Sequence, residues 1–412
     1  MIVERNQIFN LMDTNGRRSD VLNALKIYLE ILEELQETFP AEHWGTYPES
    51  LSQFLFYEKA LEKSPDVFKK HSNYDRFIRE LGDDRRKFLD RDKRWVAENL
   101  PGLAKDLDEA IEKRARHYTS NLVKMGFADG NRKITEAGYS YLKGTIVRDE
   151  LEELLPLDNV NLALLRQLSK LKIFGSPVDG KRSFYAPFLM GLVLLLDDEA
   201  IDAHSFEVIV QGLSPYSSEE VKEAVRGKGK CVSELEEAIR DIHIVIPEEL
   251  AGKNDVEYDV FRRIFKGSNS NDSISKASYD FFCALKAFRD DRTEAAYQDL
   301  LACLDRESSA SLYKAFGYGK AIFAAGNRGS RYDLERFLEK NKDHPFLASG
   351  DLVGAFYTAF ARSKWIDGIR EYSDTTVRLL GATGLFRFKN LPELSYREIL
   401  SHMLDVEDLR GQ

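Results

Sequence analysis

Apolar residues at helical spacing run through most of the chain. From residue 20 to residue 39 they recur every three or four positions, so they lie on one helical face, and Asp20 is placed to cap the first turn. A second helix is predicted from Pro48 to Pro65, because proline is tolerated in a first turn and ends a helix elsewhere. The same pattern predicts a mainly α protein from further helical stretches at 74–100, 278–304, 311–325, 333–340 and 351–369.

The pattern changes between residues 106 and 141. Residues 106–125 have helical spacing, and residues 126–134 then place a Gly130-Asn131 turn between two short extended pieces. Thr135 follows as the N-cap of another helix. A helix, a small hairpin and a helix in this order are typical of the wing end of a winged helix-turn-helix.

Two weaker echoes of this order follow at 162–184 and 372–388, where a helical face leads into a short aromatic strand. Polar loops rich in Gly, Ser and Asn separate the helical patterns, and 267–273 is the clearest linker. We therefore predict a mainly α fold with small β-wings, built from winged helix-turn-helix units plus helical domains. The predicted regions are an N-terminal helical region (1–104), a winged-helix unit (105–150), a second helical or winged-helix-like domain (151–266) and a C-terminal helical domain (267–412).

Composition places the chain among globular proteins, with 43% hydrophobic residues in 412. The three cysteines form no Cys-x-x-Cys pair, which suits a reducing cytoplasm. The N-terminus is charged almost at once, unlike a signal peptide. The most apolar stretch, 188–196, is far shorter than the roughly twenty residues that cross a bilayer. We expect a cytoplasmic protein with no membrane partner.

The net charge of −10 argues against nucleic-acid binding, because Lys and Arg make the phosphate contacts that dominate affinity. Net charge is only an average, however, and basic residues cluster locally. The clusters lie at 85–94, 113–116, 226–230 and 262–266.

Catalytic motifs are missing from the sequence. No Gly-x-x-x-x-Gly-Lys-Ser/Thr loop or Gly-x-Gly-x-x-Gly fingerprint occurs, and the seven histidines lack metal-ligand spacing. Two spellings of a nuclease motif, Asp179-Gly180-Lys181 and Glu220-Val221-Lys222, fall in a predicted turn and a predicted helix and not on strands. We expect no cofactor, no metal site and no catalytic activity in this chain alone.

The winged-helix unit is the remaining functional candidate. Such a module would place a helix in the major groove and its wing over the backbone, where basic side chains contact phosphate and polar ones read base edges. The predicted DNA-binding residues are Lys113, Arg114, Arg116, Ser120, Asn121 and Lys124 on the helix and Asn131, Arg132 and Lys133 on the wing.

Residues 119–142, with Leu122-Val123-Lys124-Met125-Gly126-Phe127 and Ile134-Thr135-Glu136-Ala137-Gly138, resemble the N-terminal DNA-recognition region of AlwI-type type IIS restriction and nicking endonucleases. The stretches 187–207 and 375–386 are similar to later pieces of that region. In that family a metal-dependent nuclease domain follows, whereas this sequence ends at Gln412. The resemblance implies a recognition protein or subunit of a restriction-modification or phage-defence system, with cleavage supplied by a protein partner, and carries over no catalytic residue.

A second hypothesis is a helical scaffold or adaptor whose winged helix docks protein. Its acidic faces, such as residues 149–153, would then bind a basic partner.

Overall fold

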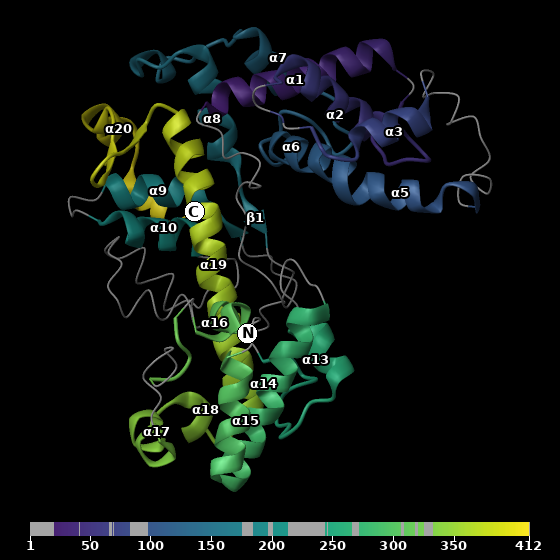
Figure 1. Ribbon diagram of the computed structural model, residues 1–412. Helices are drawn as coiled ribbons and strands as arrows, with labels where there is room; N and C mark the ends of the chain where they lie inside the picture. Colours follow the sequence, from purple (N-terminus) through teal and green to yellow (C-terminus); the bar gives the residue numbers. More distant parts are fainter. Residues whose placement is uncertain are drawn as a thin grey trace. The chain divides into compact units, whose positions relative to one another are not determined.

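The computed structural model describes residues 20–40, 42–65, 68, 70–82, 98–174, 184–196, 201–212, 244, 246–265, 272–305, 309–317, 320–324 and 333–411. This part of the chain is mainly helical and carries two small antiparallel sheets, which confirms the predicted mainly α class. It divides into two compact units (Figure 1). Among these described residues, unit 1 holds those from 244 to 370 and unit 2 holds those from 20 to 212 and from 371 to 411. This division differs from the four predicted regions, because unit 2 combines residues from all four of them.

Unit 2 begins with helices packed around aromatic side chains. Asp20 caps the first helix as predicted, since its carboxylate accepts a 3.0 Å hydrogen bond from the amide of Asn23. The second helix starts at Ser52 and not at Pro48, because residues 46–50 form a turn in which Thr46 accepts from the amides of Glu49 and Ser50. The bounds are α1 (Val21–Thr38), α2 (Ser52–Lys63), α3 (Tyr74–Leu81), α5 (Pro101–Leu107), the π-helical turn η3 (Asp108–Glu112) and α6 (Lys113–Lys124).

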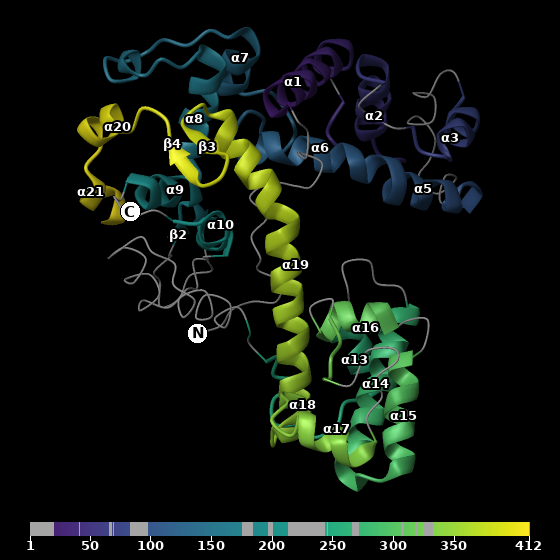
Figure 2. The same cartoon turned by 60° about the vertical axis from the view of Figure 1, so that its left-hand side comes forward.

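The predicted N-terminal region and winged-helix unit share one core. The ring of Tyr28 in α1 stacks on Tyr118 of α6 with centroids 5.5 Å apart, and Phe68 meets both rings edge-on. All three side chains are buried. Because α5, η3 and α6 form one continuous run of helix beside α1 and α2, residues 98–125 are held by the residues that precede them (Figure 2).

The two helix–strand echoes pair within unit 2. In the first, α8 leads to the antiparallel pair of β1 and β2, and in the second, α19 (Leu352–Ala382) leads to the antiparallel pair of β3 and β4. The patterns predicted a helix followed by a short aromatic strand at both places, and the structure adds the antiparallel pairing. Phe386 of β3 lies between Phe188 of α9 and Phe206 of α10, at 5.6 and 6.4 Å. The bounds are α7 (Glu136–Lys143), η4 (Glu152–Leu154), α8 (Asn159–Lys170), β1 (Ile173–Phe174), β2 (Phe184–Tyr185), α9 (Pro187–Leu196), α10 (Ala203–Gly212), β3 (Phe386–Phe388), β4 (Pro392–Leu394), α20 (Arg397–Met403) and α21 (Val406–Gly411).

Unit 1 is a helical bundle with a phenylalanine-rich core. Phe356 stands at its centre, with Phe316 at 4.1 Å and Phe281 at 5.7 Å, and all three are buried. The bounds are α13 (Tyr258–Ile264), α14 (Asp272–Asp291), α15 (Glu294–Asp305), α16 (Ser309–Phe316), α17 (Leu334–Asn341), α18 (Pro345–Ala348) and α19 (Leu352–Ala382), whose last residues belong to unit 2. Among the described residues, none of these helices or those of unit 2 is long and apolar enough to span a bilayer.

Candidate nucleic-acid interface

The hairpin after α6 begins with a glycine that ends the helix. Gly126 has φ of 73°, a left-handed conformation that glycine adopts without strain. Its amide donates to Val123 O over 3.0 Å, and the amide of Phe127 donates to Leu122 O over 2.8 Å. This pair of bonds is the Schellman motif, which satisfies the last carbonyls of a helix and turns the chain.

The hairpin itself has a three-residue loop. Ala128 and Ile134 form an antiparallel bridge, and the amide of Asp129 donates to Lys133 O over 2.9 Å. The Asp129 carboxylate accepts from the amides of Asn131 (2.8 Å) and Lys133 (2.9 Å) and so orders the tip. The sequence predicted a Gly130-Asn131 turn, and the observed loop adds Arg132, which occupies the left-handed position of such loops with φ of 61°.

Arg132 is tied into the protein. Its Nε donates to Thr119 Oγ1 over 3.1 Å, and its guanidinium lies 5.2 Å from the centre of the Trp44 ring. Its carbonyl accepts a 2.9 Å bond from Gln36 Nε2 of α1. Burial and the nearby Arg116 lower the pKa of Arg132, although Asp129 opposes them. This arginine therefore joins the hairpin to α1 and α6 and is not extended toward solvent.

The motif Ile134-Thr135-Glu136-Ala137-Gly138 serves the local fold. Thr135 Oγ1 accepts from the amide of Gly138 at 3.1 Å, as an N-cap does, and donates to Gly126 O at 2.7 Å. At Gly138 a Cβ would lie 2.1 Å from Phe127 O, so only glycine lets α7 approach the hairpin backbone this closely. Capping by Thr135 and close packing at Gly138 thus explain why these two residue types occur in the motif.

The solvent face of α6 consists of four polar residues. Lys113, His117, Ser120 and Lys124 follow one another at intervals of four, three and four, which puts them on one side of the helix. Lys113 and Lys124 are exposed and the other two are half-buried, with Ser120 Oγ donating to His117 O. Asn131 and Lys133 of the hairpin are exposed as well. Of the nine predicted contact residues, Lys113, Lys124, Asn131 and Lys133 are the four that are exposed.

Three of the other predicted residues have buried or half-buried side chains. Asn121 is 2% exposed and lies in the core. Arg116 donates to Asp108 Oδ1 (2.6 Å) and to Gln53 Oε1 (3.0 Å). Arg114 is half-buried and reaches the hydroxyl of Tyr57 at 3.4 Å.

A polar hollow of about 390 Å³ adjoins the N-terminal half of this face. Burial and the nearby Arg114 lower the pKa of His71. Its Nδ1 accepts from the amide of Asn73 at 3.2 Å, and this bond leaves the proton on the other ring nitrogen. No pattern in the sequence indicated that His71 would join this face. The hollow is lined by His71, Asn73, Asp106, Glu109, Ala110, Lys113, Arg114 and His117.

A buried carboxyl group lies beneath this helix, at the end of η3. Glu112 is 0% exposed, and its Oε1 accepts a 2.7 Å bond from the amide of Tyr47. Its Oε2 has no hydrogen-bond partner among the described residues. Burial raises the pKa of Glu112 to about 8, against the opposing effect of the Tyr47 bond. Such π-helical turns are rare and often occur at functional sites. Helical spacing beside Ile111 and Ala115 was the only signal for its burial.

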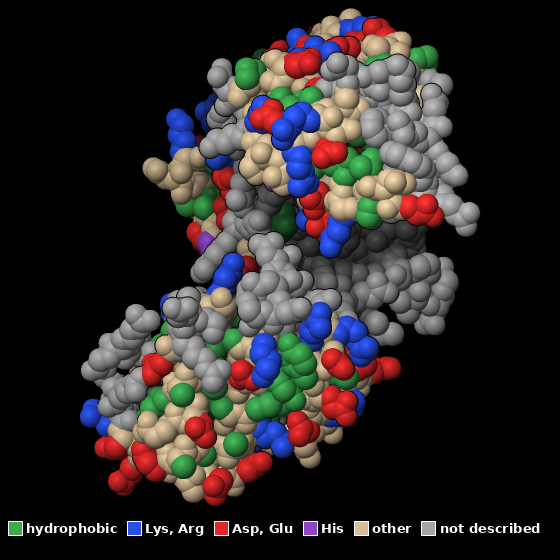
Figure 3. Space-filling model, turned by 45° about the vertical axis from the view of Figure 1, so that its right-hand side comes forward, with side chains coloured by type: hydrophobic (Ala, Val, Ile, Leu, Met, Phe, Trp, Pro, Cys, Tyr) green, Lys and Arg blue, Asp and Glu red, His purple; other side chains and the backbone are tan. Residues whose placement is uncertain are grey.

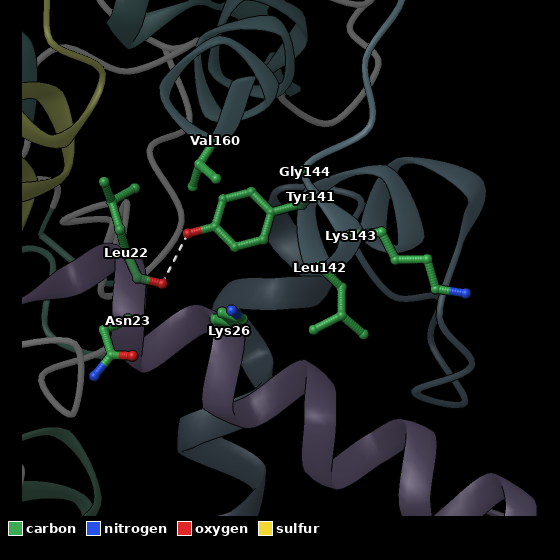
Figure 4. Close-up of a pocket in the computed structure, with 8 residues that line it drawn as sticks. All are labelled: Leu22, Asn23, Lys26, Tyr141, Leu142, Lys143, Gly144 and Val160. Atoms are coloured by element: carbon green, nitrogen blue, oxygen red, sulfur yellow. Dashed lines mark hydrogen bonds between the residues drawn. The ribbon is translucent and has the colours of Figure 1, made fainter. Parts of the chain in front are cut away.

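A second hollow, of about 240 Å³, lies between α1, α7 and α8 (Figure 4). The Tyr141 hydroxyl donates to Leu22 O over 2.8 Å and so fastens α7 to the start of α1. Lys26 and Lys143 lie at its rim, whereas its walls are mostly apolar. We assign it to packing between these helices.

Surface charge is mixed. On the described part of the face in Figure 3, Lys and Arg side chains alternate with Asp and Glu and form no broad patch of one sign. No group of three metal-ligating side chains occurs among the described residues. The nuclease-like spellings at 179–181 and 220–222 and the basic clusters at 85–94 and 226–230 lie outside those residues.

Comparison with known proteins identifies no relative: no protein-family model, curated protein or solved structure matches this chain.

Proposed function

We propose that this chain binds DNA through the solvent face of α6 and the hairpin at 129–133. The observation that carries the proposal is the placement of Lys113 and Lys124 on the exposed side of one helix that leads directly into a hairpin exposing Asn131 and Lys133. Winged-helix recognition of DNA combines these two elements: a helix enters the major groove, and a wing contacts the backbone. Lysines would contact phosphate, and Asn131 has the amide that can read adenine.

The proposed role is that of a recognition protein or subunit in a restriction or phage-defence system. A nuclease partner would supply cleavage. The purified chain with magnesium is then expected to leave plasmid DNA intact, and linear or nicked product would contradict this division of labour.

Salt dependence tests DNA binding directly. A randomised DNA duplex of about 30 base pairs is titrated with the protein by fluorescence anisotropy at several salt concentrations. Each lost phosphate contact lowers the slope of log K against log salt by about 0.9. The triple substitution Lys113→Ala, Lys124→Ala and Lys133→Ala should therefore weaken binding and flatten the slope.

The matched control removes the same charge from exposed lysines of unit 1, through Lys253→Ala, Lys340→Ala and Lys342→Ala. It should leave affinity and slope unchanged. Equal losses in the two triple variants would mean that only net charge matters, and no salt-sensitive binding by the wild type would remove the proposal.

The mixed surface charge and the net charge of −10 favour one alternative, a helical scaffold or adaptor that docks protein through its winged helix. It predicts that the wild-type chain does not change the fluorescence anisotropy of the duplex at any salt concentration.

A further inference from the structure

Large apolar side chains are concentrated on the connection between α7 and α8. Val147 is 90% exposed, and Leu151 and Leu154 are 53% and 54% exposed. In the described part of the chain, the one other large hydrophobic residue with comparable exposure is Leu391, at 44%. Single exposed aliphatic residues are ordinary, but three within one short segment mark that segment as a candidate interaction site.

We infer that the 147–154 segment is a docking site for a protein segment that presents Lys or Arg beside apolar side chains. This inference does not rest on DNA binding by α6. In both ribbon views the segment runs along the edge of unit 2 (Figures 1 and 2).

The backbone of the segment is fixed from within by a capping box. Asp149 Oδ1 accepts from the amides of Leu151 (3.0 Å) and Glu152 (2.8 Å), and the amide of Asp149 donates to Glu152 Oε2 over 3.0 Å. This reciprocal arrangement starts η4 and fixes the direction of the chain on both sides of Leu151.

Two arginines, Arg166 of α8 and Arg148 of the segment itself, join the segment to α8 and to the residues just before it. Arg166 donates to Glu152 Oε1 and to Val147 O, both over 2.6 Å. Arg148 donates to the carbonyl of Leu157 and to Asn159 Oδ1. The segment is therefore ordered before any partner arrives, and an ordered site loses less conformational entropy on binding.

The charges left on the surface of the segment are negative. Glu152 is paired with Arg166: the hydrogen bond between them lowers the pKa of Glu152 and raises the pKa of Arg166. Asp149, Glu150 and Glu153 are exposed, and among the described residues neither Glu150 nor Glu153 forms an ion pair. Apolar side chains edged by carboxylates complement a basic, partly apolar partner.

The same charges disfavour other occupants. DNA phosphates would be repelled by this surface. A second copy placed symmetrically would set the same carboxylates against each other, since a two-fold interface brings like surfaces together. A basic protein segment is the occupant that satisfies both the apolar and the acidic side chains.

Selection from a random twelve-residue peptide library tests the inference on the intact chain. Peptides that bind the wild type should be enriched in Lys or Arg next to apolar residues. The triple variant Val147→Ser, Leu151→Ser and Leu154→Ser should bind them at least tenfold more weakly, while Leu391→Ser binds them as the wild type does. All three serines replace exposed side chains, so thermal melting should stay within a few degrees, which circular dichroism checks.

A charge arm completes the experiment. Glu150→Gln with Glu153→Gln should weaken the selected peptides several-fold and reduce the salt sensitivity of binding, and the exposed pair Glu335→Gln with Glu339→Gln should not. Peptides without basic residues, or equal binding by the triple serine variant, would overturn the inference. Wild-type dimers in sedimentation that are lost in the triple variant would overturn it too, in favour of a second copy.

DNA titration of the triple serine variant keeps the two proposals separate, since its duplex binding should equal that of the wild type.

Discussion

The Nε of Arg132 donates a 3.1 Å hydrogen bond to Thr119 Oγ1, whose own hydroxyl donates to Ala115 O at 2.9 Å. A basic residue at the tip of the hairpin is thereby fixed to the buried side of α6. Because Arg132 also has positive φ and lies over Trp44, its side chain compensates for a backbone conformation that non-glycine residues rarely adopt. We treat it as a structural residue of the proposed interface.

Replacing Arg132 therefore tests stability and not phosphate contact. Arg132→Ala loses the Thr119 bond and the ring contact and keeps an unfavourable φ, so we expect a loss of about 1–3 kcal/mol in the free energy of unfolding. Arg132→Gly loses the same contacts but relieves the backbone, and should be about 1 kcal/mol more stable than the alanine variant. Urea unfolding measures both.

Measurement of DNA binding distinguishes a structural Arg132 from an Arg132 that contacts phosphate. The folded alanine variant should keep the wild-type salt slope of binding. A slope reduced by about one with unchanged stability would instead make Arg132 a phosphate contact.

Gly138→Ala should be strongly destabilising. The added Cβ would lie 2.1 Å from Phe127 O and 2.8 Å from Ile134 Cγ2, so α7 must move away from the hairpin. We expect a loss of about 3 kcal/mol or more, at the upper end of overpacking effects, seen as a lowered melting temperature. Gly130→Ala is the matched control, since a Cβ there meets nothing within 4 Å, and it should change stability by no more than about 0.5 kcal/mol. Equal melting temperatures for the two variants would contradict the close packing of α7 on the hairpin.

Glu112 should make stability fall as the pH rises. Its pKa is 4.5 in the unfolded chain and about 8 in the folded protein, so the folded state holds a proton that the unfolded state releases. This contribution to stability is fully present below pH 4.5 and is lost as the pH rises from 4.5 to 8, at no more than about 1.4 kcal/mol per pH unit. Glu112→Gln imitates the protonated acid and should remove this slope.

The control for Glu112 allows for its charged neighbours. Asp108 and Arg116 face the same carboxyl, and their titration remains in both proteins. The informative quantity is therefore the difference between Glu112→Gln and wild type in chemical denaturation from pH 5 to pH 8. A difference that does not grow with pH would show that Glu112 is ionised in the fold.

Local signals explain what the sequence could predict of this site. The hairpin and α7 follow from Gly126, Thr135 and Gly138, whose capping and close approach involve residues no more than about a dozen positions away. The helix–strand echoes in unit 2 were also predictable from local signals, since aromatic residues such as Phe386 stand next to a turn in the sequence.

Long-range contacts explain what could not be predicted. Arg132 and Arg116 are of a residue type that commonly contacts DNA. In the structure, however, the carbonyl of Arg132 accepts a hydrogen bond from Gln36, 96 residues away, and Arg116 donates one to Gln53, 63 residues away. His71 comes to the solvent face of α6 through folding of residues far from it in sequence. Burial of Glu112 likewise depends on Tyr47. Composition alone cannot distinguish a basic residue on a surface from one that holds a hairpin.

Lys133 and Asn131 should have separable effects on DNA binding if the hairpin acts as a wing. Both are exposed, and Asp129 fixes the backbone of both through its carboxylate. A lysine on phosphate contributes to affinity for every sequence, whereas an amide on a base edge contributes to sequence preference.

Lys133→Ala should therefore reduce the salt slope by about one and weaken all duplexes alike. Asn131→Ala should leave the slope unchanged and relax the preference among duplexes selected from a random pool, with Lys253→Ala as the control for charge. A salt slope that falls in Asn131→Ala, or a preference that changes in Lys133→Ala, would show that the hairpin does not meet DNA in this way.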